Sequence, residues 1–258
     1  MKLRVLPIAL LFALGGGVPS LLAATAAPAA AATAAYAMTD LGSLGLGVSV
    51  GFGINASGEV VGRSYLNKVF FFPCGRHTCR FTQNDPFSWV AGTMTDLGTF
   101  SATSMSEATA VNSTGDVVGG SNGQAFLVHN EKMTDLGPGE ATGINDVGEI
   151  VGNSQGAFLI SGGTRTTLPD LSSYGGGGFS SASGINNNHQ VVGASDDASG
   201  NSHAVMWSNG TFRNHNNLIP PGSCLTLNAA TAINDNGQIV ANGTNATGQT
   251  HAFLLAPS

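Results

Sequence analysis

The residues best suited to ligand binding are concentrated in residues 66–84. This stretch holds three consecutive phenylalanines, the last being Phe72, and four basic side chains that include Arg76 and His77. A phenyl ring can pack on an apolar or sugar surface, and Arg76 and His77 can donate hydrogen bonds beside it. We therefore expect Phe72, Arg76 and His77 to contact a ligand. The alternative is a surface insertion with a small core of its own.

Cys74 and Cys79 lie in the same stretch and are separated by four residues. In an exported protein, such a close pair is typical of a local disulfide. Metal ligation is the alternative because His77 lies between the two thiols, but no fourth ligand follows at a recognisable spacing. The sequence favours a Cys74–Cys79 disulfide and no metal site, and it leaves Cys224 unpaired.

Ser154 is the central residue of Gly-Asn-Ser-Gln-Gly, which matches the nucleophile motif of serine hydrolases. That motif requires a strand that turns sharply into a helix. No helical pattern follows Ser154, and serine recurs at the equivalent positions Ser64 and Ser195. We assign no catalytic residue. No Gly-Lys-Ser or Gly-Lys-Thr sequence occurs, so phosphate binding has no support and we expect no cofactor.

Four aspartates could supply carboxylate pairs, but they occupy equivalent positions in a repeat. A reaction at one centre gains little from a group that recurs around a molecule, so we expect each carboxylate to accept backbone N–H bonds at a strand end. The four residues are Asp40, Asp96, Asp135 and Asp170.

The elements that must position these residues are five imperfect copies of one hairpin. Each copy has a small and an aliphatic residue, Asn, a short polar turn that usually contains Gly, and two aliphatic residues. This pattern predicts a β-hairpin with Gly in the left-handed position, and the Asn side chain can hold the turn. In the fourth copy His189 replaces that Gly, so we expect a positive φ there. The copies cover residues 53–62, 110–119, 143–152, 184–193 and 232–243.

Two further strand patterns lie between successive hairpins. One is an aromatic run, which recurs five times and ends at residues 251–255. The other is Met-Thr-Asp-Leu-Gly, which first occurs at residues 38–42. The chain thus begins with one pattern and ends with the other. Five complete four-stranded units require residues 37–41 to pair with residues 251–255, which is the ring closure of a propeller.

We therefore predict an all-β fold in which residues 38–258 form a single β-propeller domain of five four-stranded blades. These 221 residues give about 44 per blade, within the ~40–45 of known four-stranded blades. An open β-solenoid is the alternative. Its rungs are nearly constant in length, whereas successive hairpin asparagines are 57, 33, 41 and 48 residues apart.

The last aromatic strand, His-Ala-Phe-Leu-Leu at residues 251–255, and the hairpin before it resemble the HAF-repeat family of bacterial extracellular proteins. The resemblance covers residues 38–258. It departs at Pro86 and at residues 203–205, and the His is absent at Gln124 and Gly156. It implies export and a repeat architecture, and it brings no catalytic residue.

The N-terminus has the features of a secretory signal peptide over residues 1–37. Lys2 and Arg4 precede a short apolar run and an Ala-rich stretch, with cleavage expected between about residues 26 and 37. Without Lys2 and Arg4, seven basic and 15 acidic residues remain, a net charge of −8. This balance argues against nucleic acid and anionic membranes as partners. We expect a secreted or periplasmic protein without a membrane anchor.

Taken together, these features favour an exported, non-catalytic binding protein whose partner is a protein or a neutral glycan. A secreted hydrolase or lyase that acts on polysaccharide is the second interpretation, because propellers host both functions. A structural component of the cell envelope or matrix is the third. An enzyme would show a cleft with unrepeated acids and a perturbed pKa.

Overall fold

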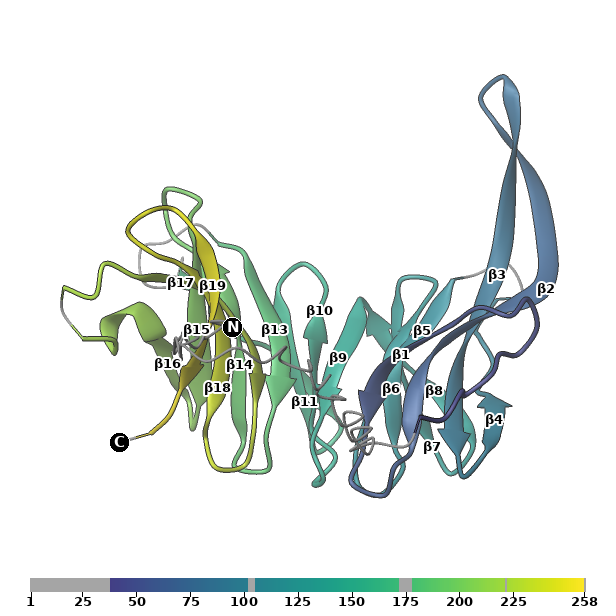
Figure 1. Cartoon of the computed structure of the whole chain (residues 1–258), viewed down its shortest axis with the longest axis horizontal. Coiled ribbons are helices and arrows are strands. Elements are labelled where there is room, and N and C mark those ends of the chain that lie inside the picture. The colour runs from purple at the N-terminus through teal and green to yellow at the C-terminus, as the bar shows by residue number, and fades with distance from the viewer. Residues whose placement is uncertain (1–37, 102–104, 172–177, 221, 258) are drawn as a thin grey trace, which may run out of the picture. The chain divides into compact units, whose positions relative to one another are not determined.

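β-Strands make up almost all regular structure in the computed structural model, which describes residues 38–101, 105–171, 178–220 and 222–257 (Figure 1). The predicted signal peptide, residues 1–37, lies outside this range. The strands form five antiparallel sheets, which we call A to E in chain order. The all-β prediction is therefore confirmed.

Each sheet is built from strands that are consecutive in the chain. Sheet A contains β1 (Ser49–Ile54), β2 (Val60–Cys74), β3 (His77–Val90) and β4 (Thr93–Asp96), and sheet B contains β5 (Ser106–Val111), β6 (Val117–Ser121), β7 (Gln124–His129) and β8 (Lys132–Pro138). Sheet C contains β9 (Glu140–Ile144), β10 (Ile150–Asn153), β11 (Ala157–Ser161) and β12 (Thr164–Thr167). Sheet D contains β13 (Ser180–Ile185), β14 (Gln190–Asp196), β15 (Ser202–Ser208) and β16 (Thr211–Asn214), followed by the 3₁₀ helix η2 (His215–Asn217). Sheet E contains β17 (Thr226–Ile233), β18 (Ile239–Thr244) and β19 (Thr250–Leu255).

The repeated hairpin joins the first two strands of every sheet. In sheet A, Asn55 Oδ1 accepts the N–H groups of Ser57 (3.1 Å) and Glu59 (3.0 Å), so its side chain holds the turn. Gly58 adopts φ +84°, the left-handed conformation that suits glycine. His189 occupies the equivalent position in sheet D with φ +59°, which confirms the predicted positive φ.

In sheets A to D, the glycine after the two aliphatic residues is required by the close approach of the first strand. A Cβ at Gly119 would lie 2.0 Å from the backbone O of Glu107, and one at Gly152 would lie 2.2 Å from the backbone O of Glu140. The first strand is bulged at this point, between Ala108 and Ala110 in sheet B. The bulge brings its backbone over the glycine, and any side chain there would force the strands apart.

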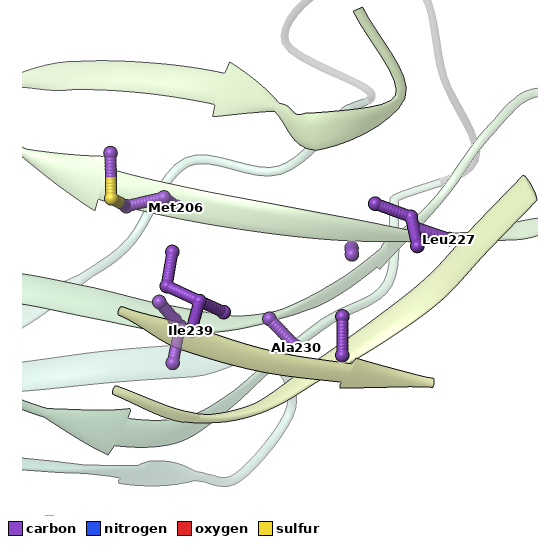
Figure 2. Packing of buried hydrophobic residues seen from close by; sticks show 7 residues of the cluster. Met206, Leu227, Ala230 and Ile239 are labelled. Atoms are coloured by element: carbon purple, nitrogen blue, oxygen red, sulfur yellow. The ribbon is translucent and has the colours of Figure 1, made fainter. Parts of the chain in front are cut away.

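Successive sheets pack face to face through the two aliphatic residues of each second strand. These neighbours point to opposite faces because side chains alternate along a strand. In sheet B, Val117 packs with Val61 of sheet A, and Val118 packs with Ile150 of sheet C. Figure 2 shows the equivalent cluster between sheets D and E, to which Met206, Leu227, Ala230 and Ile239 belong.

The five first strands also meet one another. β1 contacts β5, β5 contacts β9, β9 contacts β13, and β13 contacts β17. Small residues occupy the points of closest approach. One cavity of about 390 Å³ is lined by all five: Gly53, Ala110, Gly143, Gly184 and Ala232.

Sheet E differs from the prediction because it has three strands rather than four. Residues 38–43 form no strand here, and Ala37 lies outside the described residues. The predicted pairing of residues 37–41 with residues 251–255 is thus not formed in this structure. Every pair of named strands is antiparallel, so the described residues show no parallel pairing between coils of the kind that a β-solenoid forms.

Candidate binding cleft

A cleft of about 680 Å³ opens where sheets A, B and C meet, at the ends of the strands opposite the asparagine turns. β2 and β3 supply Arg63 and Asn84, β5 supplies Glu107, and β9 supplies Glu140. The β10–β11 turn adds Gln155. The volume lies within the ~300–1,000 Å³ usual for small-molecule sites.

The polar centre of the cleft consists of Arg63, Glu107 and Glu140. Arg63 Nη1 donates to Glu107 Oε2 at 2.6 Å, and the Glu107 carboxyl group lies near that of Glu140. Burial, followed by the neighbouring Glu107 carboxyl group, raises the pKa of Glu140 above its usual 4.5.

Asn84 presents an unused hydrogen-bonding group to the cleft. Its side chain is 1% exposed, and Nδ2 donates to the backbone O of Ser106 at 2.8 Å. A carbonyl oxygen only accepts, so this bond fixes the amide and leaves Oδ1 as a free acceptor. Within the part of the chain that the structure describes, neither Asn84 Oδ1 nor Arg63 Nε has a partner. Buried polar atoms are rarely left unpaired, so each atom has a hydrogen bond left for a ligand or a bound water molecule to make.

Two glycines give the cleft its shape. A Cβ at Gly120 would lie 3.0 Å from Cγ of Glu140, so the missing side chain leaves the space that Glu140 occupies. At Gly139 a Cβ would lie 2.2 Å from the backbone O of Asn153, and φ is +117°. Glu140 is thus presented from a turn that passes directly over the end of β10.

The sequence-predicted ligand residues lie elsewhere. Residues 66–84 do not form a loop but extend β2 and β3 into a long hairpin beyond the other strands of sheet A (Figure 1). The Cys74–Cys79 disulfide is present near the tip, so that prediction is confirmed. Phe72 pairs with Cys79, and His77 pairs with Cys74 beside the turn that contains Arg76. All three predicted residues are exposed, and none lines the cleft.

The other motifs have structural roles. Ser154 lies in the short turn between strands β10 and β11 and borders the cleft, whereas a nucleophile elbow lies between a strand and a helix. Asp40, Asp96 and Asp135 each accept the N–H of the glycine two residues later, at 3.0, 2.8 and 2.7 Å. Cys224 is a free, exposed thiol.

Two further searches of the described residues are negative. No group of three or more His, Cys, Asp or Glu side chains is arranged to hold a metal ion. No helix in the same part of the chain is long and apolar enough to cross a membrane.

Sequence reasoning missed Glu107 and Glu140 because both lie just outside the repeated motif. They occupy the same position of the first strand in sheets B and C, where the other three sheets have Val50, Ser181 and Thr226. An alignment of the five copies that extended a few residues further toward the N-terminus would have shown a glutamate at the same position in two successive copies.

No family model, curated protein or solved structure matches this chain. The functional argument therefore depends on the geometry of the cleft.

Proposed function

We propose that this chain is an exported, non-catalytic binding protein that takes a neutral glycan into the cleft of sheets A, B and C. The observation that carries the proposal is the free, buried Oδ1 of Asn84, which needs a donor such as a sugar hydroxyl. The Cys74–Cys79 disulfide supports an oxidising compartment outside the cytoplasm.

The charges in the cleft favour a neutral ligand over a charged one. The Arg63 guanidinium is balanced by the Glu107 carboxylate at 2.6 Å, and burial raises the pKa of Glu140. Arg63 and Glu140 together supply hydrogen-bond donors and acceptors for sugar hydroxyls. An acidic ligand would find no unpaired cation among these three groups, and a cation would lie beside Arg63.

Calorimetric titration against dextran, laminarin and galactomannan, with alginate as the acidic comparison, tests the proposal. We expect one of the neutral glycans to bind. Arg63→Ala and Glu140→Ala should each weaken it roughly tenfold or more, because each removes a hydrogen bond that involves a charged or acidic group. Arg76→Ala is the matched control, since this arginine lies at the hairpin tip outside the cleft.

Two results would contradict the proposal. One is that none of the three neutral glycans binds. The other is that Arg63→Ala and Glu140→Ala bind normally while an Arg76→Ala/His77→Ala variant does not. That second result would move the site to the hairpin tip.

A secreted hydrolase or lyase is the second candidate, favoured by the neighbouring carboxyl groups of Glu107 and Glu140 in the cleft and by the raised pKa of Glu140. Incubation with the glycan that binds would decide: new reducing ends or unsaturated ends that disappear in Glu107→Gln would support catalysis.

The scaffold that we propose for this function is a five-bladed β-propeller closed by the N-terminal strand. Four antiparallel four-stranded sheets, a fifth with three strands, and the sequential contacts of the five first strands support it. Such closure protects terminal strand edges.

A further inference from the structure

Neighbouring sheets pack through one kind of interface, which occurs four times in the structure. Sheets A and E, at the two ends of the series, each carry one half of this interface with no sheet of the described residues packed on it. The second strands contribute four pairs in which each side chain is no more than 4% exposed: Val61–Val117, Val118–Ile150, Val151–Val191 and Val192–Ile239. By strand register, Val240 of sheet E and Val60 of sheet A occupy the positions that would form the next pair in this series. Val240 is 41% exposed, and its neighbour Leu254 on β19 is 65% exposed.

The first strand of sheet A is uncovered in the same way. Ile54 is 69% exposed, whereas its equivalents in the next two sheets, Val111 and Ile144, pack against the cluster shared with the preceding sheet. Exposed apolar side chains on sheets A and E thus correspond to side chains that are buried or partly buried at the internal interfaces.

A hydrogen-bond series along the asparagine turns ends at the same two sheets. The Nδ2 of each repeated asparagine donates to the backbone O of the asparagine in the following sheet. The four links are Asn55 to Asn112 (2.9 Å), Asn112 to Asn145 (3.2 Å), Asn145 to Asn186 (3.1 Å) and Asn186 to Asn234 (2.9 Å). Among the described residues, Asn234 Nδ2 is bonded only within its own turn, to Gln238 Oε1 at 2.9 Å.

We propose that sheet E packs on sheet A of the same chain, with Asn234 Nδ2 donating to the backbone O of Asn55. Val240 and Leu254 then cover Ile54 and Val60. This inference specifies the closing interface of the proposed propeller scaffold and rests on it. It is independent of glycan binding, because the cleft is built by sheets A, B and C alone.

The missing fourth strand of sheet E is the Met-Thr-Asp-Leu-Gly segment, residues 38–42. Its equivalents pair in one register: Phe87 with Asp96 and Trp89 with Met94 in sheet A, and Phe126 with Asp135 and Val128 with Met133 in sheet B. The same register pairs Phe253 with Asp40 and Leu255 with Met38. Met38 is 99% exposed, so its side chain is available for this contact.

Trp89 provides an independent sign of this strand. Its equivalent Trp207 donates from Nε1 to the backbone O of Pro169 at 2.6 Å, and Pro169 follows the fourth-strand pattern of the preceding sheet. Trp89 Nε1 is buried without a partner among the described residues. Pro169 lies two residues after Thr167, which pairs with Phe158 as Asp96 pairs with Phe87. Gly42 lies two residues after Asp40 in the same way, so closure brings the backbone O of Gly42 toward Trp89 Nε1.

A second copy of the chain could cover the same surfaces, but the connection favours closure within one chain. The backbone N–H of Leu44 donates to Ser64 Oγ at 2.9 Å, as that of Phe100 donates to Ser121 Oγ at 3.2 Å. Leu44 and Phe100 each lie four residues after the repeated aspartate. The segment that follows residues 38–42 is therefore hydrogen-bonded to sheet A in the same way as the segment that follows β4 is hydrogen-bonded to sheet B.

Engineered disulfides test the register directly. In the exported protein carrying Cys224→Ser, we expect Met38→Cys/Leu255→Cys to form an intramolecular disulfide, seen as a faster-migrating monomer on non-reducing gels and mapped by mass spectrometry. Met38→Cys/Leu254→Cys is the matched control, because Leu254 points to the opposite face of β19. Disulfide-linked dimers, equal yields from the two pairs, or no disulfide would each overturn closure within one chain.

The asparagine series gives a second test with its own control. Asn→Asp keeps the Oδ1 that holds the turn and removes the Nδ2 donor. Asn186 and Asn234 are matched because each bonds to a Gln four residues later. We expect Asn234→Asp to lower the Tm about as much as Asn186→Asp does. A Tm unchanged by Asn234→Asp would contradict the Asn234–Asn55 bond, whatever the glycan-binding assays show.

Discussion

At the scale of single residues, the cleft depends on one carboxyl group that is easier to protonate than usual. Burial and the neighbouring Glu107 raise the pKa of Glu140, and Gly120 leaves the space in which its side chain lies. The same group therefore links the protonation state of the cleft to the stability of the fold.

Glu140→Gln tests this link. Because the folded state binds the Glu140 proton more tightly than the unfolded state does, this residue favours folding most below its usual pKa of 4.5, and the benefit falls as pH rises through the folded pKa. Glutamine stays neutral and removes that dependence. Thermal melts should show a higher Tm for Glu140→Gln at pH 8 than for the wild type, and little difference at pH 4. A difference that does not vary with pH would contradict the raised pKa.

His189 carries two opposing effects. Its φ of +59° is strained for a side chain, at a cost of about 1 kcal/mol, while its Nδ1 lies 2.7 Å from Glu149 Oε2. An exposed pair of this kind contributes about 0.5 kcal/mol. Urea melts should therefore show a small gain for His189→Gly, about 0.5 kcal/mol, and a larger one in a Glu149→Gln background. Destabilisation in both backgrounds would mean that the turn tolerates histidine without strain.

At the scale of elements, the extended hairpin of β2 and β3 is the main departure from the repeat. The antiparallel pairing continues to Cys74 and His77, and the rings of Phe70 and Phe81 lie 6.3 Å apart on one face. Phe71, 69% exposed, has no such cover. The extension thus has only a small core, and the disulfide near its tip closes it.

Shortening the hairpin tests whether it contributes to binding. Residues 68–81 can be replaced by Asn-Gly, the sequence of the equivalent turn at Asn122 and Gly123 in sheet B. We expect the Tm to change by less than about 4 °C, because few buried contacts are lost. Glycan binding in the cleft should be retained. Loss of binding with an unchanged Tm would assign the site to Phe72, Arg76 and His77.

At the scale of the whole molecule, stability depends on whether the repeat is complete. A three-stranded sheet E leaves β19 with an open edge, and exposed edges favour aggregation. The apolar side chains uncovered on sheets A and E add to that tendency.

Deletion of residues 38–42 tests the contribution of the N-terminal strand. We expect a Tm lower by about 5 °C or more and earlier aggregation, since a loss of 1 kcal/mol shifts the Tm of a domain of this size by ~2–4 °C. Deletion of residues 256–258, which follow β19, is the control and should have little effect. Equal melting of the two deletions would show that residues 38–42 support no strand.

The local features of this protein could be predicted from its sequence. The asparagine turns, the positive φ of His189, the small residues of the first strands and the Cys74–Cys79 disulfide follow from neighbours within a few residues. Such features depend on backbone sterics and on short loops, which act before any sheet packs against another.

The cleft was decided only by the tertiary structure. Arg63, Glu107 and Glu140 belong to three sheets and are separated by 44 and 33 residues in the chain. They meet because the apolar faces of sheets A, B and C pack together, and packing brings side chains into contact without regard to their distance in sequence. The raised pKa of Glu140 has the same origin: burial and a neighbouring carboxyl group exist only after the sheets have assembled.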